Sequence, residues 1–369
     1  MPWHWNFRCL AAFSALACGA HAQTGDSGSA SKHDSPAAQA ESVMEKQSRS
    51  PWLLVPLISS NPKLGTSVGG MVGYITRFDS RSEPSLLGLQ AQYSNTSSRT
   101  LGIGGKFYWN ENRDRVNVGV LGGEVSNDYL DFLGTGQEVR SEEKLRAVFL
   151  RYQHQFFPSW FFGAQAVYSN YDVEGTDPTS DQALELAGLA GSVSSGIGLI
   201  ASYDTRNNTN NPTEGTFAQL HNLAFRESLG SDADFDVVTA DWRWYTRTSD
   251  KNVVVLHAKG RWTRDAPESK QSTVELRGYT RGQYLGRNSL TIEAENRYML
   301  EPRWGGKAFA GVACLYGGGE HCSDDQIFPM FGAGLFYVLK PASNMVVSAE
   351  FAKGSGDNRG FYLNFGHRF

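Results

Sequence analysis

The sequence lacks any apolar run that approaches the roughly 20 residues needed by a membrane-spanning helix. It also lacks an excess of one charge, because 34 Lys and Arg residues nearly balance 38 Asp and Glu residues. No basic or acidic block is present, which argues against nucleic acid as a partner. These absences exclude an α-helical membrane protein, but they are compatible with a membrane-spanning β-barrel, in which only alternate residues face lipid.

Residues 1–22 have the pattern of a signal peptide. Arg8 supplies a positive charge, an apolar segment of about ten residues follows, and the Ala-His-Ala sequence at 20–22 is typical of a cleavage site. The alternative is a lipoprotein signal that would acylate Cys18, but such a signal prefers Leu where this sequence has Ala15. We therefore expect export and cleavage after residue 22.

Cysteine is scarce, with four residues in 369, and two of the four fall within the predicted signal peptide. The remaining pair, Cys314 and Cys322, would lie in an oxidising compartment. We expect these two residues to form one disulfide, and two free thiols are the alternative.

The mature chain divides into two parts. Residues 23–50 are rich in Ser, Ala, Gly, Gln and Asp, which predicts a disordered periplasmic linker. The linker is too short for an independent domain, which needs roughly 50 residues. From residue 51 to residue 369 the pattern changes to regular alternation of apolar and polar residues, so we expect one β-barrel domain over 51–369.

The alternation is clearest where one side of a strand is apolar and the other is charged. A period of two places successive side chains on opposite faces of a strand. Rows of charge on the polar face indicate a wet lumen rather than a protein core, and the apolar face would then contact lipid. In the segment 290–298, one face carries Leu290, Ile292 and Ala294, and the other carries Thr291, Glu293, Glu295 and Arg297.

The pattern predicts an all-β fold, a transmembrane antiparallel β-barrel of about 16 strands in the outer membrane. Every strand must pair on both edges, because lipid offers no hydrogen-bond partner to an open edge. The count also sorts short connections to the periplasmic side and long ones to the outside, as expected. We expect a monomer surrounded by outer-membrane lipids. The strands are expected to begin near Trp52, Thr66, Leu86, Thr100, Arg115, Glu143, Trp160, Ser192, Thr216, Phe235, Asn252, Arg287, Lys307, Met330, Asn344 and Arg359.

Four local motifs stand out within the predicted barrel. The first is Arg277-Gly278-Tyr279 in a long external loop, followed by the strand that carries Glu293 and Glu295. The second, Asp204 and Arg206 with Pro212 and Gly215, falls at an inner turn. The third spans residues 131–136 in an outer loop, and the fourth is the last strand, residues 360–369.

Together these motifs resemble the BamA/TamA family of outer-membrane assembly and secretion barrels, also called the bacterial surface antigen family. The resemblance implies a sixteen-stranded barrel whose Arg-Gly-Tyr loop folds back into the lumen, where Arg277 pairs with carboxylates. A guanidinium offers the planar fork of donors that suits a carboxylate. The family often supplies an Asp on the thirteenth strand, but residues 309–313 contain no acid, so we expect Glu293 or Glu295 as the partner.

The same resemblance sets an expectation for the segment before the barrel. Family members that insert or secrete proteins carry periplasmic POTRA domains there, whereas we expect only the linker of residues 23–50. The chain therefore resembles a short branch of the family without POTRA domains, and the receptor part of an assembly machine would have to come from another chain.

The last strand resembles the signal read by the barrel-assembly machinery, which we expect as a partner during insertion of this barrel. Along this strand, alternate residues are mostly apolar, and the last residue of the chain is aromatic. We expect these residues, together with His367, to share the lipid-facing side. They are Phe361, Leu363, Phe365 and Phe369.

The sequence contains no convincing catalytic motif. Residues 65–69 spell Gly-Thr-Ser-Val-Gly, but a nucleophile elbow needs a strand before it and a helix after it, and here a loop and a strand are expected. Phosphate-binding and zinc-binding motifs are absent from the sequence. We therefore expect no enzymatic activity, no cofactor and no metal.

Three functional hypotheses remain. The first is outer-membrane biogenesis or transport, in which the barrel opens or distorts the membrane at the seam between its first and last strands. The second is a porin-like channel, which the charged lumen would favour. The third is a membrane anchor or surface scaffold for a separate periplasmic partner.

Overall fold

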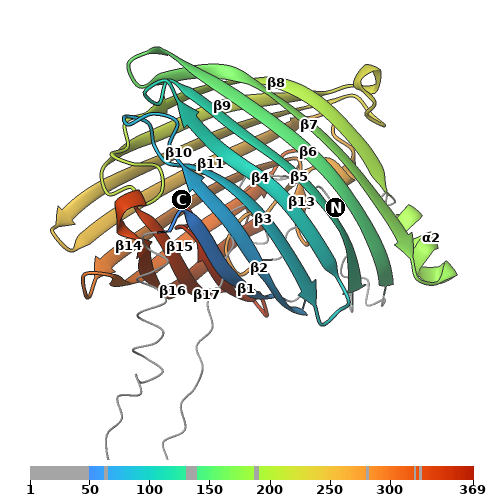
Figure 1. The fold of residues 1–369 in the computed structure, drawn as a ribbon. Helices are drawn as coiled ribbons and strands as arrows, with labels where there is room; N and C mark the ends of the chain where they lie inside the picture. The colour runs from blue at the N-terminus through green and yellow to red at the C-terminus, as the bar shows by residue number, and fades with distance from the viewer. Residues whose placement is uncertain are drawn as a thin grey trace, which may run out of the picture.

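The computed structural model describes residues 50–61, 65–129, 139–186, 191–279, 282–319, 321–323 and 326–369. The predicted signal peptide, nearly all of the predicted linker and the motif at 131–136 lie outside the described residues. Sixteen antiparallel strands form a closed barrel (Figure 1), which confirms the predicted fold class. Among the described residues, no helix is long and apolar enough to cross a membrane.

The barrel strands follow one another in chain order, and the last pairs with the first. Most begin close to the predicted positions; the largest difference is at β6, which starts at Val139 rather than near Glu143 because its pairing with β5 continues further into the outer loop. The strands are β1 (Trp52–Asn61), β2 (Gly65–Thr76), β3 (Ser85–Ser94), β4 (Arg99–Trp109), β5 (Asp114–Tyr129), β6 (Val139–Phe157), β7 (Trp160–Gly175), β8 (Ser192–Asp204), β9 (Gly215–Phe225), β10 (Phe235–Ser249), β11 (Asn252–Arg264), β14 (Asn288–Met299), β15 (Trp304–Tyr316), β16 (Ile327–Lys340), β17 (Met345–Gly354) and β18 (Arg359–Phe365).

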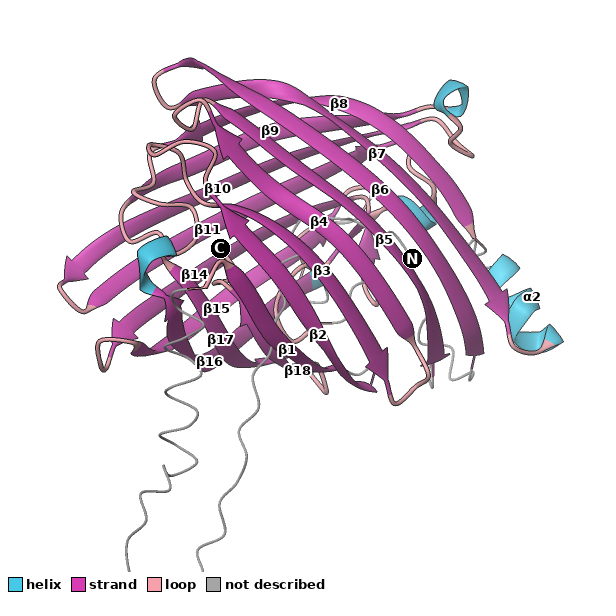
Figure 2. Ribbon diagram, in the orientation of Figure 1, coloured by secondary structure: helices cyan, strands magenta, loops and turns pink. Residues whose placement is uncertain are grey.

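The remaining elements are short and belong to the connections. A two-stranded sheet of β12 (Ser272–Thr273) and β13 (Leu285–Gly286) lies within the long loop between β11 and β14. Figure 2 shows the helix α2 (Pro178–Leu186) beyond the end of β7. Single turns of 3₁₀ helix are η3 (Glu227–Leu229), η4 (Glu268–Lys270) and η6 (Pro341–Ser343).

The two faces of the barrel wall differ as the alternation predicts. Apolar side chains such as Leu54, Leu101 and Leu199 are well exposed on the outside, and charged side chains such as Glu293 and Glu295 are buried in the lumen. The lumen is therefore filled rather than empty at the level of these carboxylates. Alternate burial along β14 shows the pattern directly.

Most of the long connections lie at one end of the barrel, and most of the short turns lie at the other. The end that carries the turns after β2, β4, β6, β8, β10, β14 and β16 is called the short-turn end here, and the other is called the long-loop end. This is the asymmetry of outer-membrane barrels, in which short turns face the periplasm. The turns of residues 77–84 and 205–214 are longer than the others at the short-turn end, and the second of them folds into the lumen.

Among the described residues, the pairing between β1 and β18 is the shortest between neighbouring strands of the barrel. The register there covers Ser59 opposite Tyr362 and Ser60 opposite Phe361, whereas β1 pairs with β2 over its whole length. Beyond these pairs, an apolar cluster lies beside the seam. This seam cluster contains Leu53, Val55, Leu57, Met71, Leu339, Met345 and Phe365.

The end of the chain corrects one expectation. Phe361 is exposed, but Leu363, Phe365 and Phe369 are buried, as is His367. Phe365 packs within the seam cluster. After it the chain leaves the sheet at Gly366, whose φ of +88° is easily adopted only by glycine. His367 and Phe369 therefore lie in the lumen rather than on the lipid face.

Candidate functional site: the lumen loop and the seam beside it

Arg277 lies in the lumen, in the loop between β11 and β14. Its guanidinium donates to Glu295 at 2.8 Å and to Glu293 at 3.2 Å, and both acids come from β14. It also donates to Glu350 of β17 at 2.8 Å. One cation thus joins three carboxylates on two strands, and all four side chains are almost completely buried.

The neighbouring loop residues bind the barrel wall beside the seam. Gly278 has φ of +90°, and its N–H donates to the hydroxyl of Tyr362 on β18 at 2.8 Å. The hydroxyl of Tyr279 donates to the carbonyl of Pro329 at 2.6 Å and accepts from the N–H of Ser355 at 2.8 Å. The loop therefore contacts β16 and β18 as well as β14, and it is held inside the barrel by both polar and apolar contacts.

Replacing Gly354 with alanine should loosen this loop. A Cβ atom at Gly354 would lie 2.5 Å from the ring of Tyr279, so the ring would have to leave its place against β16. We expect faster proteolysis of the loop and a lower unfolding temperature. The free energy of unfolding should fall by about 1–3 kcal/mol. Gly306→Ala is the matched control, because the nearest atom to its added Cβ would lie at 3.9 Å. Equal behaviour of the two variants would show that Tyr279 is not tightly held.

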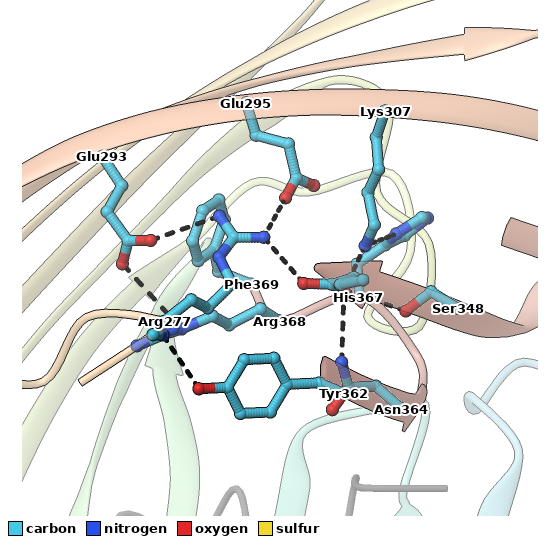
Figure 3. Close-up of polar contacts among 12 residues, drawn as sticks. Arg277, Glu293, Glu295, Lys307, Ser348, Tyr362, Asn364, His367, Arg368 and Phe369 are labelled. Atoms are coloured by element: carbon cyan, nitrogen blue, oxygen red, sulfur yellow. Dashed lines mark hydrogen bonds and ion pairs between the residues drawn. The ribbon is translucent and has the colours of Figure 1, made fainter. Parts of the chain in front are cut away.

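The segment after β18 enters the same cluster (Figure 3). Arg297 of β14 donates to the backbone oxygen of Phe369 at 2.5 Å and to Glu295 at 2.7 Å. The ring of Phe369 lies 4.7 Å from that of His257, between centroids. The segment is thus bound to the strand that also holds Arg277, which links the last strand at the seam to the lumen loop.

Lysine and arginine side chains balance the three acids. Lys307 of β15 pairs with Glu350, and Arg368 approaches Glu293 at 3.9 Å and also donates to the backbone of Glu275. A buried charge is tolerable only when it is paired and hydrogen-bonded. The carboxylates are engaged by cations of the chain itself. Among the described residues, no group of His, Cys, Asp and Glu side chains is placed to hold a metal ion.

The Asp204 motif builds a second ion cluster towards the short-turn end. Asp204 accepts from Arg115 of β5 at 2.7 Å and from Arg206 at 2.8 and 2.9 Å, and its own side chain is 3 % exposed. Arg115 stacks over the ring of Phe161, and Arg206 over the ring of Phe217. The turn motif therefore points into the lumen and connects β5 with β8.

The same turn reaches across the lumen to the seam side. Asn210 donates to the carbonyl of Ser343 at 2.9 Å, and Asn211 hydrogen-bonds with His367 at 3.1 Å. The carbonyl of Pro212 accepts from Arg297 at 3.5 Å. The turn ends at Gly215, where φ is +105° and an added Cβ would meet the backbone of Thr205 at 2.3 Å. The long inner turn is thus a crossing strap rather than a free periplasmic loop.

The structure brings together three of the sequence motifs: the Arg277 loop, the Asp204 turn and the last strand. It adds Glu350, Arg297 and Tyr362, which the sequence reasoning did not select. Glu350 could have been found, because it alternates with Ser348 on the inward face of β17. The pairing of Glu350 with Arg277 could not have been predicted, because this pairing depends on where the loop lies.

Cys314 and Cys322 form a disulfide with their Cα atoms 5.7 Å apart. The bond joins the end of β15 to the loop that precedes β16. It lies at the long-loop end, away from the Asp204 turn, and it constrains a surface connection rather than the lumen cluster.

Comparison with known proteins agrees with this architecture. A family model described as the Omp85 superfamily domain matches residues 147–369, more than half of the chain. The chain belongs to the Omp85 superfamily. Barrels of this superfamily are outer-membrane proteins, and the match includes the Asp204 turn, the Arg277 loop and the last strand. No match was found among curated protein sequences.

Solved structures show the same fold at low sequence identity. BamA from Haemophilus ducreyi lacking POTRA domains 1–3 is 12 % identical, with a TM-score of 0.54 over 86 % of this chain and 70 % of that one. CdiB from Acinetobacter baumannii is 12 % identical, with a TM-score of 0.58 over 86 % of this chain and 59 % of that one. CdiB from Escherichia coli is 12 % identical, with a TM-score of 0.56 over 85 % and 62 % of the two chains. The Omp85 chain described here thus spans about 60 % of the length of the CdiB proteins.

Proposed function

We propose that this barrel resides in the outer membrane and acts there in membrane biogenesis or transport, by opening the seam between β1 and β18 to a polypeptide or a lipid. The observation that carries the proposal is the short register of two residue pairs at this seam. Each backbone hydrogen bond contributes only about 1 kcal/mol net. By the registers of the described residues, opening the barrel here disrupts fewer backbone hydrogen bonds than opening it at another junction between strands.

The lumen cluster supports this proposal because it lies against the same seam. Tyr362 of β18 accepts from Gly278, and the segment that follows β18 is bound by Arg297. Movement of β18 away from β1 would therefore act directly on the Arg277 loop. A separate periplasmic partner would deliver the polypeptide or lipid to the barrel.

The filled lumen speaks against a wide passive channel. The Arg277 loop lies in the lumen against β14 to β18, and the strap of residues 207–215 crosses the lumen towards the short-turn end. A porin-like role would require both to move. No described feature favours the anchor hypothesis over the proposed one.

A disulfide tether across the seam should abolish function. Ser60→Cys with Phe361→Cys places the two thiols on directly opposite residues of β1 and β18. Deleting the gene should alter outer-membrane protein or lipid content, and the oxidised tether should fail to restore it, whereas the reduced form should succeed.

The matched control for the tether is Val68→Cys with Tyr93→Cys, an opposite pair between β2 and β3 that leaves the seam free. Reduction also acts on the native disulfide in both variants, so this effect cancels in the comparison. Full activity of the oxidised seam tether, or an unchanged envelope after gene deletion, would contradict the proposed function.

A further inference from the structure

An aromatic groove lies on the outer surface at the short-turn end. It has a volume of about 720 Å³, and its polar edge is formed by Asp79, Asn110 and Glu111. Pockets of roughly 300–1,000 Å³ with apolar walls and a few polar groups are typical of small-molecule sites. The apolar walls are Phe78, Phe107, Trp109 and Val116.

The groove opens outward, towards the surroundings of the barrel rather than the lumen. Leu101 and Ile103 of β4 are exposed on the outer face, and Phe107 and Trp109 follow on the same side because side chains alternate. Phe78 comes from the turn after β2 and lies 6.4 Å from Phe107, between ring centroids. In the proposed membrane orientation, the groove would lie at the headgroup level of the periplasmic leaflet.

Two turns that interlock give the groove a fixed shape. Asn110, Glu111 and Asn112 all have positive φ, between +54° and +67°, which is unfavourable for side-chain-bearing residues. The side-chain oxygen of Asn112 accepts from the N–H of Glu83 at 2.7 Å, and its own N–H donates to Ser82 at 2.9 Å. These cross-turn contacts hold the unfavourable backbone and therefore the polar edge.

The polar edge carries charges of both signs. Glu111 pairs with Arg81 at 2.6 Å, and this pair is exposed, so it contributes little to stability and can exchange partners. A hydrogen bond from the hydroxyl of Ser82 holds the pKa of Asp79 below its usual value, against a smaller opposing effect of burial. Asp79 is therefore ionised at neutral pH. The edge presents two carboxylates and one guanidinium next to an indole ring.

We propose that this groove binds a phospholipid with a zwitterionic amine headgroup. The ammonium would lie between the Asp79 and Glu111 carboxylates and the face of Trp109, where a cation is attracted to the ring. The phosphate would contact Arg81, and the acyl chains would follow Phe78, Phe107 and Val116. The inference depends on the outer-membrane location proposed above, but not on a role in assembly or transport.

Native mass spectrometry of the full-length barrel, purified in detergent, tests the inference. The protein is mixed with equal amounts of phosphatidylethanolamine and phosphatidylglycerol that carry the same acyl chains. We expect about three- to tenfold higher retention of phosphatidylethanolamine, the range that one cation–aromatic contact with an exposed ion pair can supply. Trp109→Ala and Glu111→Gln should each reduce this preference.

Trp304→Ala is the matched control, because Trp304 is another exposed tryptophan at the short-turn end and lies against Tyr337. It should leave the lipid preference unchanged. Glu111→Gln preserves the shape of the turn residue and keeps the test valid if Trp109→Ala fails to fold. Equal retention of the two lipids by the unmodified protein, or the same loss of preference in the Trp304 variant, would overturn the inference. The seam tether tests the proposed function separately.

Discussion

Arg277→Ala should cost about 3–5 kcal/mol of stability, because removing one partner from a buried, hydrogen-bonded ion cluster is strongly destabilising. Glu293, Glu295 and Glu350 would lose their shared guanidinium, and all three are almost fully buried. Arg277→Lys should recover only part of the loss, since an ammonium lacks the planar fork that reaches two strands at once. The stability of each variant is measured by unfolding in urea, and the folded fraction is monitored as the heat-dependent shift in gel mobility.

The control for Arg277→Ala is Arg99→Ala. Arg99 also pairs with an acid on a neighbouring strand, Glu124 at 2.7 Å, but both side chains are exposed, so its removal should cost less than about 1 kcal/mol. Adding Glu350→Gln to Arg277→Ala should lower the stability further, because Lys307 would then lose its buried carboxylate partner. If Arg277→Ala unfolds at the same urea concentration as Arg99→Ala, the loop is not locked by this cluster.

Asp204→Asn should have the second largest effect, about 3 kcal/mol or more, by leaving two arginines without their anion. Asn preserves the shape of the side chain but not its charge, so Arg115 and Arg206 would face each other in the lumen. We expect the strap of residues 207–215 to become accessible to protease from the periplasmic side, in addition to a lower unfolding temperature.

Asp236→Asn is the corresponding control, since Asp236 pairs with Arg226 at 2.8 Å in a partly exposed position. Its effect should be well below that of Asp204→Asn. A strap that stays resistant to protease in the Asp204 variant would indicate that the contacts of Asn210 and Asn211 hold the strap without the ion cluster.

The last strand shows both the strength and the limit of reading a sequence. Its alternation predicted the strand correctly, but the expectation of a shared lipid face was wrong for His367 and Phe369, which lie in the lumen. Gly366 allows the chain to leave the sheet, and nothing local says where it then goes. The role of this strand as an assembly signal stays a prediction, as do the signal peptide and the linker.

By itself, the sequence determined the barrel, the number of its strands, the inward direction of Glu293 and Glu295, and the arginine loop as the segment to examine. These features follow from a period of two residues and from local motifs, which are written along a single strand or turn. Only the tertiary structure decided that Glu350 is a third partner of Arg277, that the inner turn crosses to Asn211 and His367, and that the register at the seam is short. These depend on the closure of the barrel, which brings together residues that are far apart in the chain and whose pairing no local pattern records.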